Sequence, residues 1–160
     1  QVIAKDAKIQ VEFNPKVVKQ FRLIGYENKV LENQDFRNDK VDAGEIGAGH
    51  SVTAIYELAL QESPPNDKIA DVSLRFKDVD ALNTPIEMTK SISTGDIIND
   101  YNTASVSFRL SAVVALYAEI LRGSYWARDK KFEDALALAK NVDSELKSPK
   151  KTKELVSIIE

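Results

Sequence analysis

The chain has 160 residues, with 22 basic and 25 acidic side chains, a formal charge of −3, one histidine and no cysteine. The absence of cysteine excludes a disulfide framework, a thiolate zinc site and a cysteine nucleophile, and one histidine excludes a multi-histidine metal site within one chain. The slightly acidic balance argues against a nucleic-acid-binding protein, which usually shows a basic surface. The longest strongly apolar stretch, 110–118, is far shorter than the roughly 20 residues that span a bilayer, so we expect no membrane insertion by this region.

The first half of the chain has the period-two alternation of β-strands that bury one face. The pattern predicts strands over residues 8–13, 18–26, 50–61, 70–77 and 86–89. No helical pattern separates these strands, which indicates an antiparallel sheet, because parallel strands are usually joined by helical crossovers. Residues 27–45 are rich in Asn, Asp and Lys, and we expect them to form a long exposed excursion.

The second half changes to a helical period. From about Ala104 the apolar residues recur at helical spacing, and they are Val106, Leu110, Val113, Tyr117 and Ile120 or Leu121. Gly123 stands where a helix C-terminus favours a left-handed residue. Further helices are predicted over 132–142 and, after a Ser148 cap, from Pro149 onward. The predicted fold class is therefore α+β, with an antiparallel, β-sandwich-like sheet in residues 1–92 and a three-helix segment in residues 104–160.

His50 is the one imidazole that could act as a general base near neutral pH. A nucleophilic triad would also need a serine on a sharp strand-to-helix turn, and the chain has no G-x-S-x-G motif. The adjacent Ser51 would point to the opposite face of a strand. We therefore expect His50 to bond nearby backbone at the start of a strand, and we predict no catalytic residue.

Three segments look like ion- or phosphate-binding motifs, and each lacks a required feature. The glycine-rich run 44–49 precedes a predicted strand, whereas a phosphate loop follows a strand and opens a helix. The run 33–39 does not fit a calcium-binding EF-hand, because the register from Asn33 places Gly44 at position twelve and the register from Asp35 places Ile46 there. The segment 71–75 nearly matches the metal-ion-dependent adhesion motif D-x-S-x-S, but Arg75 replaces the last serine. We predict no metal or cofactor site, and we expect the polar residues of 71–75 to form the solvent face of a strand.

Tyr117, Tyr125 and Trp126 are a candidate aromatic platform for a sugar. Aromatic side chains beside helices more often pack in a core or between the helices. We therefore expect these three residues to serve the packing of the helical segment.

Four segments together carry a resemblance to a known family. They are 5–15 (KDAKIQVEFNP), 21–28 (FRLIGYEN), 42–57 (DAGEIGAGHSVTAIYE) and the helical part from 108 to 124. The chain resembles the C-terminal region of a family of bacterial cell-envelope proteins that contain a von Willebrand factor type A domain. The resemblance covers nearly the whole chain and is weakest over 80–102 and at the C-terminus. The segment with the glycines and the histidine is its most specific part.

The resemblance implies a longer parent protein in which this region directly follows the A domain. The chain begins at Gln1 rather than Met, and we expect it to be a piece whose A domain, with a divalent-metal adhesion site, lies upstream. The partners implied are the A domain and the region before it. We hypothesise that strands from that region and from residues 1–92 build one sandwich, so that an open sheet edge of the isolated piece would pair with another copy.

For function, the resemblance implies a non-catalytic structural and interaction module in the bacterial cell envelope, periplasmic or on the cell surface. Such a module would support recognition of an unknown protein partner by the A domain. One alternative is a free-standing glycan- or peptide-binding module that uses the 27–49 loop and the aromatic residues near Tyr125. Another is a hydrolase centred on His50, which requires a serine or a carboxylate within hydrogen-bond reach of the imidazole.

Overall fold

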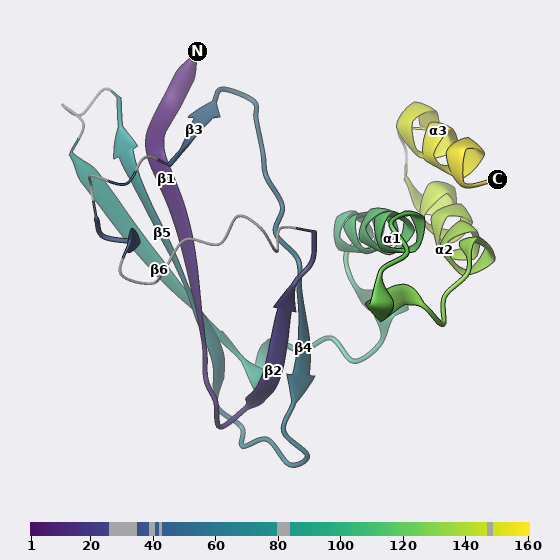
Figure 1. Cartoon of the computed structure of the whole chain (residues 1–160), viewed down its shortest axis with the longest axis horizontal. Helices are drawn as coiled ribbons and strands as arrows, with labels where there is room; N and C mark the ends of the chain where they lie inside the picture. The colour runs from purple at the N-terminus through teal and green to yellow at the C-terminus, as the bar shows by residue number, and fades with distance from the viewer. Residues whose placement is uncertain (26–34, 39–40, 42, 80–83, 147–148) are drawn as a thin grey trace. The chain divides into compact units, whose positions relative to one another are not determined.

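A computed structural model describes residues 1–25, 35–38, 41, 43–79, 84–146 and 149–160, without the side chains of Pro149 and Lys151. The chain divides into two compact units, Gln1–Ile97 and Ile98–Glu160. Figure 1 shows strands in the first unit and helices in the second. The predicted α+β class, with antiparallel sheets before the helices, is confirmed.

The described strands of the first unit form two antiparallel sheets. These strands are β1 (Val2–Phe13), β2 (Val18–Leu23), β3 (Gly44–Gly47), β4 (Tyr56–Leu60), β5 (Lys68–Asp78) and β6 (Pro85–Ser93). A four-stranded sheet has the order β3-β1-β5-β6, and a two-stranded sheet pairs β2 with β4. The small sheet lies beside the end of the large sheet where β1 turns into β2 (Figure 1).

The two sheets share a small hydrophobic core at this end. Its buried residues are Val17, Val18, Ile69 and Ala70, with Val11, Phe13 and Leu58 packed against them. Phe13 of β1 contacts Phe21 of β2 and Tyr56 of β4, with ring centroids 4.5 and 5.4 Å apart. The rings therefore bridge the two sheets, and the arrangement is sandwich-like over this part of the large sheet.

A β-bulge interrupts β1 near its start. Lys5 pairs with Lys77 and Lys8 with Arg75, so two residues of β1 lie opposite one residue of β5. Asp6, within the bulge, has a φ of 51°, a left-handed conformation that aspartate tolerates better than most residues. Its carboxylate accepts a 2.7 Å hydrogen bond from the Lys77 ammonium, which lowers the pKa of Asp6.

The predicted strand over 50–61 is wrong in its first half, because only Tyr56–Leu60 is a strand. The partner strand explains the difference. β2 ends at Leu23, and Gly25 turns the chain with a φ of 83°. The hydrogen bond from the Ile24 amide to the Ile55 carbonyl is the last described backbone contact beyond this ladder, so residues 50–55 are paired with no strand among the described residues.

The predicted excursion over 27–45 lies largely outside the described residues. Its last two positions begin a strand that the sequence pattern missed, since β3 pairs with β1 across two register shifts. Glycine has low intrinsic strand propensity, and here the pairing partner supplies the extended conformation. Phe36, which the excursion was expected to expose, is buried.

The second unit contains α1 (Val106–Leu121), α2 (Phe132–Glu145) and α3 (Pro149–Ile159). Short 3-10 helices lie at Tyr101–Thr103 and Tyr125–Ala127. The core of this unit consists of Val113, Ala135, Ala139, Val142 and Ile159. None of the described helices is long and apolar enough to cross a membrane.

Both ends of α1 are capped, and of the two caps only Gly123 was predicted from the sequence. The Ser105 hydroxyl accepts a 3.3 Å hydrogen bond from the Phe108 amide at the N-terminus. At the C-terminus the Gly123 amide bonds the Ile120 carbonyl and the Ser124 amide bonds the Glu119 carbonyl, which is the Schellman arrangement. The predicted left-handed conformation of Gly123 is confirmed by its φ of 64°.

Candidate functional site

The four-stranded sheet presents one apolar face built from three cross-strand rows. Each row has one residue from β1, one from β5 and one from β6. The first row is Ile9, Leu74 and Met88, the second is Val11, Val72 and Lys90, and the third is Phe13, Ala70 and Ile92. Residues directly opposite one another in a sheet point to the same side, so these side chains form one surface. The third row lies in the core that the two sheets share, because Phe13 and Ala70 belong to it.

The two outer residues of the first row are exposed, and Leu74 between them is half-buried. Ile9 is 59% exposed and Met88 is 53% exposed, whereas Ala70 in the third row is buried. The small sheet lies beside only one end of the large sheet (Figure 1), and the cross-strand rows continue the apolar face beyond it. Large apolar residues that are adjacent and exposed usually mark an interaction surface. We name the residues Ile9, Leu74 and Met88 the open row.

An apolar cavity lies where the covered and uncovered parts of the face meet. It has a volume of about 360 Å³ and is lined by Ile9, Val11, Phe13, Ala54, Tyr56, Leu58, Ile69, Ala70, Val72 and Ile92. Nine of these ten side chains have no polar atoms, and the lining residues come from both sheets. The space therefore suits apolar side chains and offers no cluster of polar groups for chemistry.

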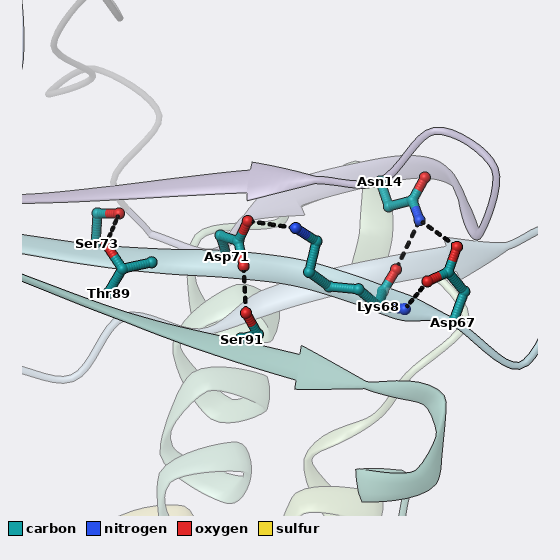
Figure 2. A network of polar contacts seen from close by, with 7 residues as sticks. All are labelled: Asn14, Asp67, Lys68, Asp71, Ser73, Thr89 and Ser91. Carbon is teal, nitrogen blue, oxygen red and sulfur yellow. Dashed lines mark hydrogen bonds and ion pairs between the residues drawn. The ribbon is translucent and has the colours of Figure 1, made fainter.

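The opposite face of the large sheet is polar, and Figure 2 shows its hydrogen-bond network. The Asp71 carboxylate accepts 2.6 Å hydrogen bonds from the Lys68 ammonium and from the Ser91 hydroxyl. These bonds, that of Lys68 first, lower the pKa of Asp71. Ser73 and Thr89 bond each other at 2.9 Å. The residues of the near-match to D-x-S-x-S thus lie within β5 and bond neighbouring side chains.

The segment 35–38 contacts this polar face. The buried Lys8 ammonium donates hydrogen bonds to the carbonyls of Asp35 and Asn38, at 3.0 and 2.7 Å. Arg37 pairs with Glu87 of β6 at 2.7 Å, which lowers the pKa of Glu87. The described part of the run 33–39, which was compared with an EF-hand, therefore binds the Lys8 ammonium through its main-chain carbonyls. The remaining positions, 33, 34 and 39, lie outside the described residues.

His50 is exposed and follows a turn, because its amide donates a 3.0 Å hydrogen bond to the Gly47 carbonyl. A Cβ added to Gly47 would lie 3.0 Å from the Nδ1 atom of His50, so the imidazole packs against glycine backbone. Among the described residues, no hydrogen bond joins the imidazole to a serine or a carboxylate. Ser51 is also exposed and outside any strand, so the alternating directions expected for this pair do not apply.

The glycine run 44–49 is the strand β3 and its following turn, and no helix begins there. Gly49 supplies a φ of 77° to that turn. Within the described parts of the chain, no group of three or more His, Asp or Glu side chains is arranged to hold a metal ion.

The three aromatic residues separate into two environments. Tyr117 packs between helices as expected, since its ring lies 5.9 Å from that of Phe132 and its hydroxyl donates to the Ile158 carbonyl. Tyr125 and Trp126 are 65% and 62% exposed, contrary to the expectation of core packing. Their rings meet edge to face at 5.5 Å, and the Arg128 guanidinium stacks 4.1 Å from the Tyr125 ring.

One buried polar cluster was not found by sequence reasoning. Arg109 of α1 bonds Asn141 at 2.9 Å and forms an ion pair with Glu145, both on α2. The ion pair lowers the pKa of Glu145. Nothing in the sequence pattern signals the burial of Arg109, because arginine is common on the solvent-exposed face of a helix. The cluster joins two helices, and we assign it a structural role.

Comparison with known proteins identifies the class of this chain. A family model described as "Uncharacterized protein YfbK, C-terminal" matches residues 1–68 and 59–160, and the chain belongs to that family. The Escherichia coli (strain K12) protein named "Uncharacterized protein YfbK" is 34% identical over 157 residues. That match covers 82% of this chain and 27% of the relative, so the chain corresponds to about a quarter of the relative's length. No solved structure matches the chain.

Proposed function

We propose that the 160 residues of this chain form a non-catalytic structural and interaction module of a longer protein. The observation that carries the proposal is the exposed open row, an apolar sheet face that the described residues of the first unit cover at one end only. The relative of much greater length supports a longer parent for this chain. The resemblance to envelope proteins with a von Willebrand factor type A domain supports an A domain as part of that parent, with this module helping it to recognise a protein partner at the cell envelope.

Burying the open row would stabilise an assembled protein. Each large apolar side chain that moves from water to an apolar contact contributes about 1.5–3 kcal/mol when its burial is complete. Ile9 and Met88 start more than half exposed, so most of that contribution is available to a covering segment. The described residues offer no comparable arrangement for catalysis, since none of their hydrogen bonds joins the His50 imidazole to a serine or a carboxylate, and the imidazole lies beside the Gly47 backbone.

Oxidation of Met88 tests this proposal directly, because Met88 is the chain's one methionine. Hydrogen peroxide converts an exposed methionine to its sulfoxide, and mass spectrometry of the peptide that contains it gives the rate. We expect Met88 to oxidise readily in the isolated 160 residues and at least about tenfold more slowly in the longer protein. The urea-unfolded chain supplies the fully exposed reference.

Two variants sharpen the result. Ile9→Glu places a charge in the open row and should restore rapid oxidation of Met88 in the longer protein. Val52→Glu is the matched control, since Val52 is also an exposed apolar residue but lies outside any strand. Equal oxidation rates in the isolated chain and the longer protein would overturn the proposal, as would a coding sequence that contains nothing beyond these residues.

A second candidate function, glycan binding, is favoured by the exposure of Tyr125 and Trp126. Exposed aromatic faces stack on sugar rings, and the neighbouring Arg128 adds hydrogen-bond donors. Trp126 is the one tryptophan, so its fluorescence should change when soluble chito- or cello-oligosaccharides bind. A Trp126→Phe variant should keep weak binding and Trp126→Ala should lose it, measured by calorimetry. The absence of any heat or fluorescence change with such sugars at millimolar concentration would exclude this candidate.

A further inference from the structure

Strand β6 is the long open edge of the first unit. It pairs with β5 without interruption from Ala70 opposite Ile92 to Lys77 opposite Pro85. Among the strands that the structure describes, none pairs with its other side. The opposite edge, β3, has four residues and two register shifts against β1. An unpaired strand presents alternate amides and carbonyls that accept another strand, and β6 is the edge regular enough to do so.

The side chains on the two faces of β6 differ in whether they already contact other side chains of this chain. Glu87, Thr89 and Ser91 point to the polar face, where each contacts a side chain of β5 or of segment 35–38. Ile86, Met88 and Ile92 share the apolar face of the sheet, and Lys90 lies among them, opposite Val72. A strand added beside β6 would therefore continue the apolar face and would meet one positive charge on it.

Lys90 disfavours a second copy of this chain as that strand. In an antiparallel pair related by a two-fold axis, residues opposite one another must share a face, so the residue numbers of each pair add to an even sum. Lys90 then meets Ile86, Met88, Ile92 or a second Lys90, and never Glu87, which belongs to the other face. Like charges directly opposite are destabilising, and a lysine directly opposite an apolar residue gains no cross-strand ion pair.

We propose that the outer edge of β6 accepts a β-strand from the remainder of the longer protein. The incoming strand alternates, with apolar side chains that cover the open row and an acidic side chain placed beside Lys90. This inference rests on the proposed function, because it names the kind of segment that covers the open row and the edge where it attaches. Main-chain hydrogen bonds along β6 supply the attachment, and Lys90 selects the register.

Amide hydrogen exchange of residues 85–93 tests the strand addition. In the isolated chain, the amides of β6 that point away from β5 should exchange rapidly, and in the longer protein they should exchange at least about tenfold more slowly. Lys90→Glu should return their exchange towards the isolated rate, and Lys90→Met should have a smaller effect. Lys19→Glu on β2 is the matched control, because Lys19 is an exposed strand lysine away from β6 and should leave the exchange unchanged.

The outcomes separate this inference from the proposed function. If Met88 is shielded from oxidation in the longer protein while the β6 amides exchange as in the isolated chain, the face is covered without an added strand, and only the present inference fails. If the isolated chain shows slow β6 exchange that depends on its own concentration, together with a dimer in sedimentation, the occupant is a second copy and the inference is also overturned. Slow exchange in Lys90→Glu equal to that of the unmodified protein would overturn the acidic partner of Lys90.

Discussion

Replacing Val113 by alanine should destabilise the helical unit, whereas the same replacement at Val114 should not. The two valines are neighbours on α1, and they have the same chemistry and the same intrinsic helix propensity. Val113 is completely buried in the core of the unit, and Val114 is 46% exposed. The comparison therefore isolates the effect of burial from that of the substitution itself.

The expected difference in unfolding free energy is about 2 kcal/mol. Removing two buried carbon atoms loses about 0.8 kcal/mol for each, and incomplete collapse of the space left behind adds about 1 kcal/mol. Alanine favours the helix over valine by about 0.5 kcal/mol at both sites, which lowers each cost equally. The net cost is then about 2 kcal/mol for Val113→Ala and close to zero for Val114→Ala.

Urea denaturation followed by helical circular dichroism measures both costs. In a unit of this size, about 1 kcal/mol corresponds to a change of roughly 4–8 °C in melting temperature, so thermal melts give an independent check. Equal losses at the two positions would refute the packing of α1 described above. A loss below about 0.5 kcal/mol at Val113 would refute it as well.

Three further results are expected. Proton titration by nuclear magnetic resonance should give Asp71 a pKa below the usual range of an aspartate, and Lys68→Met should raise it. Because the folded pKa is lowered, the contribution to stability is present above the pKa of the unfolded chain and is lost as the pH falls through the pKa of the folded protein. Gly123→Ala should lower the free energy of unfolding by about 1 kcal/mol, measured by thermal or urea unfolding, because alanine disfavours a φ of 64°. The added Cβ would meet nothing within 4 Å, so the cost comes from the backbone conformation, and Gly123→Asn should cost less. Lys8→Met should accelerate amide exchange at Asn38, whose hydrogen bond to Asp35 belongs to the segment that the ammonium holds.

Alternation and helical spacing were sufficient to predict elements such as β5 and α1. Strand β5 was recognised from its alternating residues, because one of its faces is apolar and the other polar along most of its length. Helix α1 was recognised because its apolar residues follow one another at helical spacing and Gly123 marks its C-terminus. In these elements the local signal and the tertiary environment agree, so a single sequence carries enough information.

Pairing and exposure were not predictable in the same way. The start of β4 depends on where β2 ends, and β3 is extended because β1 lies beside it. Both are properties of a neighbour rather than of the residues concerned. The exposure of Trp126 also depends on its neighbours, because the local sequence pattern is the same for an aromatic residue that faces a core and for one that faces solvent. The open row was predicted as a buried strand face, and the described residues leave part of it uncovered.

The bulge at Asp6 constrains how the length of this strand can change. It lets Lys5 and Lys8, three positions apart, occupy the same face of the sheet, so the residues before it are out of phase with those after it. Deleting one residue there would restore simple alternation and would turn Val2 to Lys5 over, bringing Lys5 to the apolar face and the buried Ala4 to the polar face. A deletion at this point would therefore act as four simultaneous substitutions, whereas a deletion in the glycine-rich turn after β3 would leave every strand in phase.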